Sequence, residues 1–194
     1  MKKKYLYDYL TSKDFEKELN RVNTKTKYIN TLKSIIYSLV VVSAFSILIA
    51  FIFIQVLQIS GKSMEPTLHD NNVVLVFKNK NVKNNDVIAF YQGNKILIKR
   101  VIASAGSWVK IDDKGNVYVD DVLLDEPYIS KKTLGNVDIE FPYQVPPESY
   151  FVLGDERESS NDSRISQIGP ISKDDVIGKV FFTFWPIKNF SFVK

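Results

Sequence analysis

The sequence contains no cysteine and only one histidine in 194 residues. Without cysteine the chain can form no disulfide framework, no thiolate zinc site, no iron–sulfur cluster and no cysteine nucleophile. A single histidine also excludes a metal site built from several imidazoles. We therefore expect neither a bound metal nor a cofactor.

The charged side chains are unevenly distributed along the chain. There are 26 basic and 22 acidic residues, a formal net charge of +4. Residues 1–33 hold nine basic and four acidic side chains, a net charge of +5, which leaves the remainder at −1. A nucleic-acid-binding domain concentrates basic residues on its folded surface. The main part of this chain does not, so nucleic acid is not expected as a partner.

The 25 residues from Ile35 to Ile59 carry no charge. About 20 apolar helical residues span the ~30 Å hydrocarbon core of a bilayer. A buried core helix is disfavoured because the run is apolar on every face. A cleaved signal peptide is disfavoured because the run begins late and is not followed by a cleavage site of small residues. Basic loops stay in the cytosol. We expect a cytosolic tail (1–33), a single-pass membrane anchor (34–58) and an extracytoplasmic domain (59–194).

Eight short runs rich in valine, isoleucine and aromatic residues follow the anchor, and Asn, Asp and Gly clusters separate them, as is typical of strands. The runs are Val73–Phe77, Val87–Tyr91, Ile96–Ala103, Trp108–Ile111, Val117–Val119, Val122–Leu124, Tyr150–Leu153 and Val176–Trp185. The segment 112–116 reads as a hairpin turn. Because no convincing helix interrupts them, the exported part is predicted to be all-β.

The segment Ser60–Leu68 directly follows the anchor and combines Gly, Ser and Pro in a pattern that suits a tight turn with an exposed hydroxyl. Such turns are mostly structural, but Ser63 becomes a candidate nucleophile if a base lies nearby. His69 is the only histidine, and a surface or turn position is the favoured interpretation for it. The remaining candidate base is a lysine kept neutral by burial.

Lys99 interrupts an otherwise apolar run, and with period-two alternation it shares a strand face with Leu97 and Val101. Desolvation between apolar neighbours would lower its pKa and allow it to act as a general base. The alternative is a lysine that extends into solvent from an edge strand.

The loop Gly154–Arg164 contains no apolar side chain. A solvated loop is the plain interpretation. Its acidic spacing could also suggest calcium, but the arginines oppose a cation site.

These three segments, in this order behind one anchor, resemble the type I signal peptidases of bacteria, in the single-span form typical of Gram-positive species. Ser-Gly-x-Ser-Met-x-Pro-Thr-Leu matches the family's nucleophile box, Ile-Lys-Arg-Val matches its base box, and the Gly154–Arg164 loop matches the third box at seven of ten specified positions. The resemblance runs from Ile35 to about Trp185.

The resemblance implies a Ser/Lys serine endopeptidase with mostly antiparallel sheets that removes signal peptides from exported precursors at Ala-x-Ala-like sites. Ser63 would be the nucleophile, Lys99 the general base, and the Ser63 N–H an oxyanion donor. Ser160 would hydrogen-bond to and orient the lysine. The implied supporting residues also include Asp162 and Arg164, which would pair with each other, together with Arg100 and Asp155. The implied pocket for small substrate side chains contains Ile59, Met64, Leu68 and Ile98.

The sequence departs from the family pattern at three places. Gly61 stands where some members carry a serine that donates a second oxyanion hydrogen bond. Glu156, Glu158 and Ser159 replace Asn, Asp and Asn in the third box, and the segment 103–107 departs from a common turn. None of these changes removes a catalytic group.

Ser63 follows Ile59 by only four residues, at most about 14 Å of extended chain, so we expect the nucleophile to work at the membrane surface. The expected partners are secretory precursors and the lipid bilayer, and the expected state is a monomer. A self-cleaving repressor-type protease is disfavoured because residues 1–33 are too short for a DNA-binding domain. A signal-peptidase-like assembly factor for pili, with or without catalysis, stays open.

Overall fold

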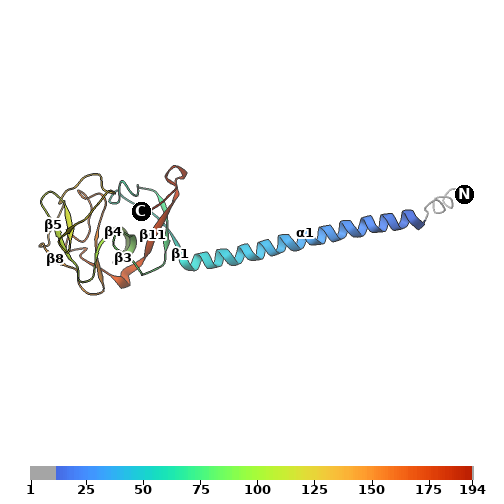
Figure 1. Cartoon of the computed structure of the whole chain (residues 1–194), viewed down its shortest axis with the longest axis horizontal. Coiled ribbons are helices and arrows are strands. Elements are labelled where there is room, and N and C mark those ends of the chain that lie inside the picture. The colour runs from blue at the N-terminus through green and yellow to red at the C-terminus, as the bar shows by residue number, and fades with distance from the viewer. Residues whose placement is uncertain (1–11, 194) are drawn as a thin grey trace. The chain divides into compact units, whose positions relative to one another are not determined.

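The structure is a computed structural model that describes residues 12–193. Residues 1–11 of the tail expected at 1–33 lie outside the described residues. The chain divides after Ala50 into a helical unit and a β unit, which are described separately (Figure 1).

Helix α1 (Ser12–Phe53) is a single α-helix of 42 residues that contains most of the expected tail and anchor. Within residues 12–193 it is the one helix long and apolar enough to cross a membrane. Ser38, Ser43 and Ser46 in its apolar part donate hydrogen bonds of 2.7 to 2.9 Å to backbone carbonyls three or four residues earlier. Their hydroxyls are therefore satisfied inside the helix, as a lipid environment requires.

The apolar run does not stay helical to Gln58, which corrects the boundary predicted for the anchor. The helix ends at Phe53, and β1 (Ile54–Gln58) pairs antiparallel with β2 (Val73–Phe77). The Lys78 N–H donates a 2.8 Å hydrogen bond to the Phe53 carbonyl, so the sheet satisfies a backbone group at the helix end. An apolar run carries no local signal for such a boundary, because the pairing partner lies far along the chain.

The β unit contains two antiparallel sheets. The larger has the order β1-β2-β11-β3-β4-β9-β10, with β12 paired to β11, and the smaller has the order β7-β6-β5-β8. The remaining strands are β3 (Val87–Gln92), β4 (Lys95–Ser104), β5 (Trp108–Ile111), β6 (Val117–Val119), β7 (Val122–Leu123), β8 (Tyr143–Gln144), β9 (Ser149–Leu153), β10 (Ile171–Ser172), β11 (Val176–Trp185) and β12 (Ser191–Phe192). Two short 3₁₀ helices, Lys173–Asp175 and Ile187–Asn189, flank β11.

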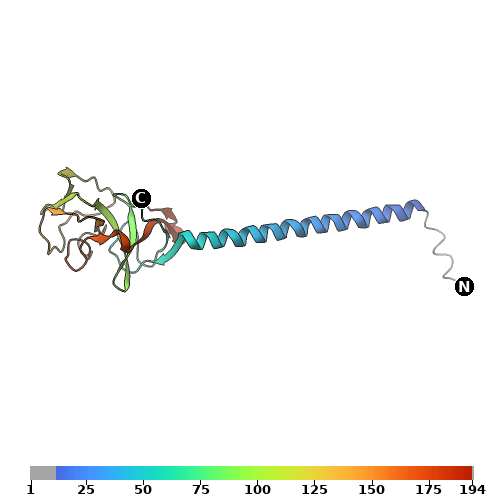
Figure 2. The ribbon, with the colours of Figure 1, turned by 90° about the horizontal axis from the view of Figure 1, so that it is seen from below.

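The predicted fold class is confirmed, and each of the eight predicted strands is present. The turn at 112–116 joins β5 to β6 as an antiparallel hairpin. The missed strands are β1 and three two-residue strands, β8, β10 and β12, which are too short to show a period. Strand β11, coloured orange to red in Figures 1 and 2, comes late in the chain but lies between β2 and β3 in the larger sheet.

Strand β4 positions the chemistry of the β unit because it pairs with β3 on one side and β9 on the other. Its apolar side chains enter three core clusters, with Ile98 against the first, Leu97 and Val101 in the second and Ile102 in the third. Any polar side chain in the middle of β4 is therefore held between packed elements. The edge-strand interpretation of Lys99 is excluded, since β4 lies inside the sheet.

Candidate active site

The nucleophile candidate Ser63 lies in the turn that joins β1 to β2. Gly61 in this turn has φ +99°, a conformation that side chains rarely adopt, and its N–H donates a 2.8 Å hydrogen bond to the Asp70 side chain. Further along, the Leu68 N–H donates to the Met64 carbonyl at 2.8 Å. The turn is thus fixed on both sides of Ser63, which stays partly exposed.

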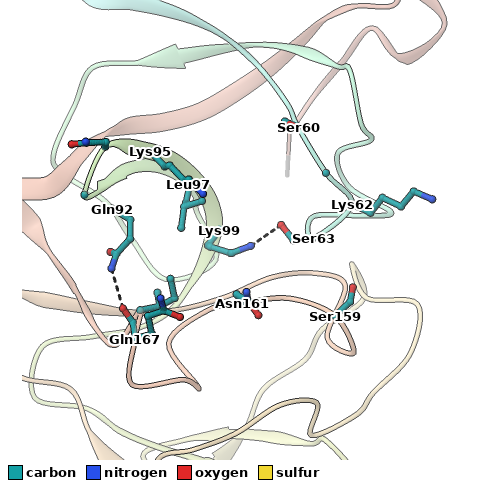
Figure 3. A pocket seen from close by; sticks show the side chains of 14 residues that line it. Ser60, Lys62, Ser63, Gln92, Lys95, Leu97, Lys99, Ser159, Asn161 and Gln167 are labelled. Atoms are coloured by element: carbon teal, nitrogen blue, oxygen red, sulfur yellow. Dashed lines mark hydrogen bonds between the residues drawn. The ribbon is translucent and has the colours of Figure 1, made fainter.

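Lys99 reaches Ser63 from β4, with 2.6 Å between its Nζ and the Ser63 Oγ (Figure 3). The lysine is 3% exposed. Burial lowers the pKa of its amine from 10.5 to about 8, with the charge of Arg164 acting in the same direction and those of Asp162 and Asp155 opposing it. The sequence predicted this environment correctly, since Leu97 and Val101 flank the lysine in the second core cluster.

A buried ion pair lies directly beside this dyad. The Arg100 guanidinium, next in sequence to Lys99, donates hydrogen bonds of 2.8 and 2.7 Å to the two carboxylate oxygens of Asp155. The Thr67 hydroxyl also donates to Asp155, and the guanidinium lies 3.9 Å from the centre of the Tyr128 ring. Arg100 is therefore stabilised by a bidentate pair and a cation–π contact. The pair connects the strand of Lys99, the turn of Ser63 and the loop that begins at Gly154.

A second buried pair shapes the Gly154–Arg164 loop itself. Arg164 Nε and Nη2 donate to the two oxygens of Asp162 at 2.8 and 2.9 Å, and Asp162 also accepts a 3.0 Å hydrogen bond from the Gly154 N–H. The Glu156 N–H then reaches the Ser63 carbonyl at 3.1 Å. The loop is thus folded back on itself and hydrogen-bonded to the nucleophile turn, and the solvated-loop interpretation is wrong.

Ser160 does not make the hydrogen bond to Lys99 that the resemblance implies. Its hydroxyl is buried and finds no hydrogen-bond partner among residues 12–193. The side chain packs against Gly154 so closely that a Cβ added there would lie 2.1 Å from the Ser160 Oγ and 2.5 Å from the Ser63 carbonyl oxygen. Gly154 is required by this close approach of two chain segments, for which the sequence offers no signal.

A third buried pair was not predicted from the sequence. Arg157 Nη2 donates a 2.5 Å hydrogen bond to Glu126, and its Nε donates to the Gly154 carbonyl at 2.9 Å. Arg157 belongs to the third box, so its position could have suggested a buried partner. Glu126 lies in the irregular segment after β7, where no pattern marks it.

His69 takes the turn position that was favoured for it. It is exposed, and its Nδ1 lies 3.9 Å from the Glu65 carboxylate. Within the described part of the chain, no group of three or more His, Cys, Asp or Glu side chains could hold a metal ion.

Two clefts open beside Ser63 and Lys99, and both are lined by these two residues. The smaller, about 390 Å³, is lined by several apolar side chains, among them Ile59, Met64 and Ile98. The larger, about 820 Å³, is lined mostly by residues with polar or charged side chains and lies along the β3–β4 hairpin (Figure 3). A polypeptide that crosses the dyad can therefore pass from one cleft into the other.

Three of the four predicted pocket residues, Ile59, Met64 and Ile98, line the smaller cleft. Leu68 does not line either cleft, which corrects its predicted role. It is completely buried in the first core cluster with Val74, on the inner side of the nucleophile turn. Its position two residues after Pro66 placed it in the motif but did not reveal the direction of its side chain.

Comparisons with known proteins found a matching family, similar sequences and a similar structure. The family described as "Signal peptidase, peptidase S26" matches residues 30–185. Signal peptidase I T of Bacillus subtilis is 32% identical over 187 residues, which cover 90% of this chain and 96% of that protein. Signal peptidase I of Bacillus caldolyticus is 36% identical over 151 residues, which cover 69% of this chain and 81% of that protein. The crystal structure of a signal peptidase I from Enterococcus faecalis V583 has 29% sequence identity to this chain and a TM-score of 0.42. The match covers 50% of this chain and 95% of that structure's chain.

We expect Asp155→Ala to lower the free energy of unfolding by about 3–5 kcal/mol, because it leaves the Arg100 guanidinium buried without its carboxylate. Urea unfolding of the detergent-solubilised chain, followed by tryptophan fluorescence, measures the change. Glu158→Ala is the matched control, since it removes an exposed partner of Lys131 and should cost at most about 1 kcal/mol. Equal losses in the two variants would contradict a structural role for the buried pair.

Lys99→Met should stabilise the β unit at pH 7 by about 2–4 kcal/mol, because folding lowers the pKa of the lysine from 10.5 to about 8. Below pH 8 the folded protein must bury a charged amine, and this cost fades as the pH rises from about 8 to 10.5. The advantage of the variant should therefore shrink over that range. Lys110→Met, at an exposed position on β5, is the control and should change stability by less than about 0.5 kcal/mol.

Proposed function

Because this chain belongs to the peptidase S26 family of signal peptidases, we propose that it is a membrane-anchored serine endopeptidase that uses a Ser63/Lys99 dyad to remove signal peptides from exported precursors. Its class, a signal peptidase I hydrolase, follows from the family match over residues 30–185 and from relatives at 32% and 36% identity. The observation that carries the choice of dyad is the 2.6 Å distance between Lys99 Nζ and Ser63 Oγ.

In the proposed reaction the neutral Lys99 amine removes the Ser63 proton while the Ser63 oxygen attacks the scissile carbonyl carbon. The tetrahedral intermediate collapses to an ester on Ser63, and the departing amine of the mature protein takes the proton back from Lys99. The lysine then removes a proton from water, whose oxygen attacks the ester carbonyl carbon. The bond to the Ser63 oxygen breaks, Lys99 returns the proton to that oxygen, and the signal peptide leaves with a free carboxylate. The lowered pKa of Lys99 supports this role, because a much larger fraction of the amine is neutral at pH 7 than in a lysine with the usual pKa.

The backbone N–H of Ser63 is the proposed oxyanion donor. In the described residues it has no hydrogen-bond partner, and it belongs to the turn fixed by the contact between Gly61 and Asp70. Gly61 has no hydroxyl to contribute, so a second donor must come from the backbone or from the substrate complex.

The smaller cleft supports a preference for small side chains before the scissile bond. Ile59, Met64 and Ile98 line it and do not line the larger cleft, and its volume of about 390 Å³ would be shared by several side chains of a bound peptide. Such a surface would accept alanine at alternate positions of an extended chain, since alternate side chains point to the same side. Ala-x-Ala-like sites are the substrate that this arrangement favours.

We place the N-terminus in the cytosol and the β unit on the outer face of the membrane, as the charge difference between residues 1–33 and the remainder requires. The proposed division is a basic tail, the apolar part of α1 as anchor up to Phe53, and the peptidase domain from β1 onwards. Ten residues separate Phe53 from Ser63, at most about 35 Å of extended chain rather than the 14 Å expected from Ile59. The nucleophile stays close enough to the bilayer to reach a membrane-inserted precursor, and both dyad residues come from one chain, which agrees with a monomer.

We expect Ser63→Ala and Lys99→Ala each to lower the cleavage rate of a precursor with an Ala-x-Ala site by about a thousandfold or more. The assay compares the detergent-solubilised protein with both variants and with Lys110→Ala, an exposed control that should retain full activity. Equal cleavage by all four proteins would exclude the dyad. Absence of cleavage by the unmodified protein would favour the non-catalytic assembly role.

The rate should also depend on pH in the direction set by Lys99. Because only the neutral amine is a base, kcat/KM should rise about tenfold per pH unit at low pH and level off above pH 8, the pKa to which burial lowers the lysine. Stopped-time assays from pH 5.5 to 9.5 measure the profile. A rate that is flat, or that falls across this range, would contradict a neutral lysine base.

A further inference from the structure

The larger cleft beside the dyad has a marked excess of positive charge. Besides Lys99 it is lined by Lys62, on the nucleophile turn, and by Lys95, at the start of β4, and its lining contains no carboxylate. Figure 3 shows Lys95 beside Leu97 on one side of the cleft and Lys62 next to Ser63 on the other, with the Lys62 side chain leading away from the dyad. The exported residues as a whole carry a net charge of −1, so this positive charge is local.

The two rim lysines are not neutralised within the protein. Both are exposed, and neither side chain forms an ion pair or a hydrogen bond with any other residue in the range 12–193. Of the carboxylates near the site, Asp155 and Asp162 are paired with buried arginines and Glu158 with Lys131, while Glu156 accepts a 3.2 Å hydrogen bond from the Glu158 N–H and Glu65 lies 3.9 Å from His69. The positive potential of the cleft is therefore available to a ligand.

The rest of the cleft surface is rich in amides. Gln92 donates a 3.2 Å hydrogen bond to the Gln167 carbonyl, which ties the β3–β4 hairpin to the turn that follows the third box. Asn94 and Asn161 also line the cleft. Amide groups can hydrogen-bond to a peptide backbone, whereas the lysines can distinguish one substrate side chain from another by charge.

The direction of a bound precursor follows from the two clefts. Ser63 and Lys99 line both, and the smaller cleft, which alone is lined by Ile59, Met64 and Ile98, is the one suited to the small residues before the scissile bond. The residues after that bond would then leave the dyad along the larger cleft.

We propose that the larger cleft binds the first residues of the mature protein and that Lys95, with Lys62 at the opposite rim, selects acidic side chains there. This inference rests on the proposed function and adds a preference to it. Exposed charge pairs are individually weak, so two lysines should favour aspartate over lysine in this part of the substrate by about threefold to tenfold in kcat/KM. The preference should decrease with salt, since both lysines are exposed.

The test uses the full chain in detergent and precursor peptides that share one Ala-x-Ala site. Aspartate, glutamine or lysine is placed at each of the four positions after the scissile bond, and kcat/KM is measured at 0.05 and 0.5 M salt. The expected order is aspartate, glutamine, lysine, with a smaller spread at high salt. Lys95→Glu combined with Lys62→Glu should reverse the order, whereas Lys110→Glu, the exposed control on β5, should retain it.

A binding measurement separates this proposal from the proposed function. Fluorescence anisotropy of labelled aspartate and lysine peptides on Ser63→Ala requires no cleavage and should show the same order of affinity. Tighter binding of the aspartate peptide without cleavage by the parent protein would reject the peptidase and keep the lysine-lined subsite for acidic side chains. Efficient cleavage with no charge preference, or with a preference unchanged in the double variant, would overturn the subsite and leave the peptidase intact.

Discussion

Arg100 and Asp155 meet inside the β unit, where both side chains are at most 1% exposed. A buried guanidinium without a partner is strongly destabilising, so each residue requires the other. Their contact joins three segments that are far apart in sequence: the turn that carries Ser63, the strand that carries Lys99, and the loop that closes against both. The 2.6 Å contact between the dyad atoms depends on this arrangement, because Lys99 is the residue immediately before Arg100 on β4.

The same loop contains two further buried arginines, each with its own carboxylate. Arg164 pairs with Asp162 and Arg157 with Glu126, and both pairs contact Gly154 through its N–H or its carbonyl. Three satisfied pairs make a rigid polar support under a small active site. Lys99 is the exception in this region, since its amine faces Ser63 and its pKa is lowered to about 8. The fold therefore pairs the three buried arginines with carboxylates and leaves Lys99, the proposed base, partly uncompensated.

Function also depends on where the apolar run changes from helix to strand. The helix ends at Phe53, and the next five residues enter the large sheet as β1, so the peptidase unit begins directly where the apolar helix ends. With α1 as the proposed membrane anchor, an extended segment this short would keep the nucleophile turn near the bilayer. A substrate that is itself anchored there would then have a high effective concentration at the site, so shallow clefts and single surface charges would be sufficient for recognition.

The sequence by itself determined the features that depend on local pattern: the apolar helix, eight of the strands, the hairpin at 112–116, and the alternation that places Lys99 among apolar neighbours. It also determined the candidate base, because a chain with no cysteine and one exposed histidine has few alternatives. Only the tertiary structure decided the helix end at Phe53, the burial of Leu68, the unpartnered hydroxyl of Ser160 and the pairing of Arg157 with Glu126. These features depend on which distant segments pack together, and the energy of a buried contact is set by the partner that folding brings to it.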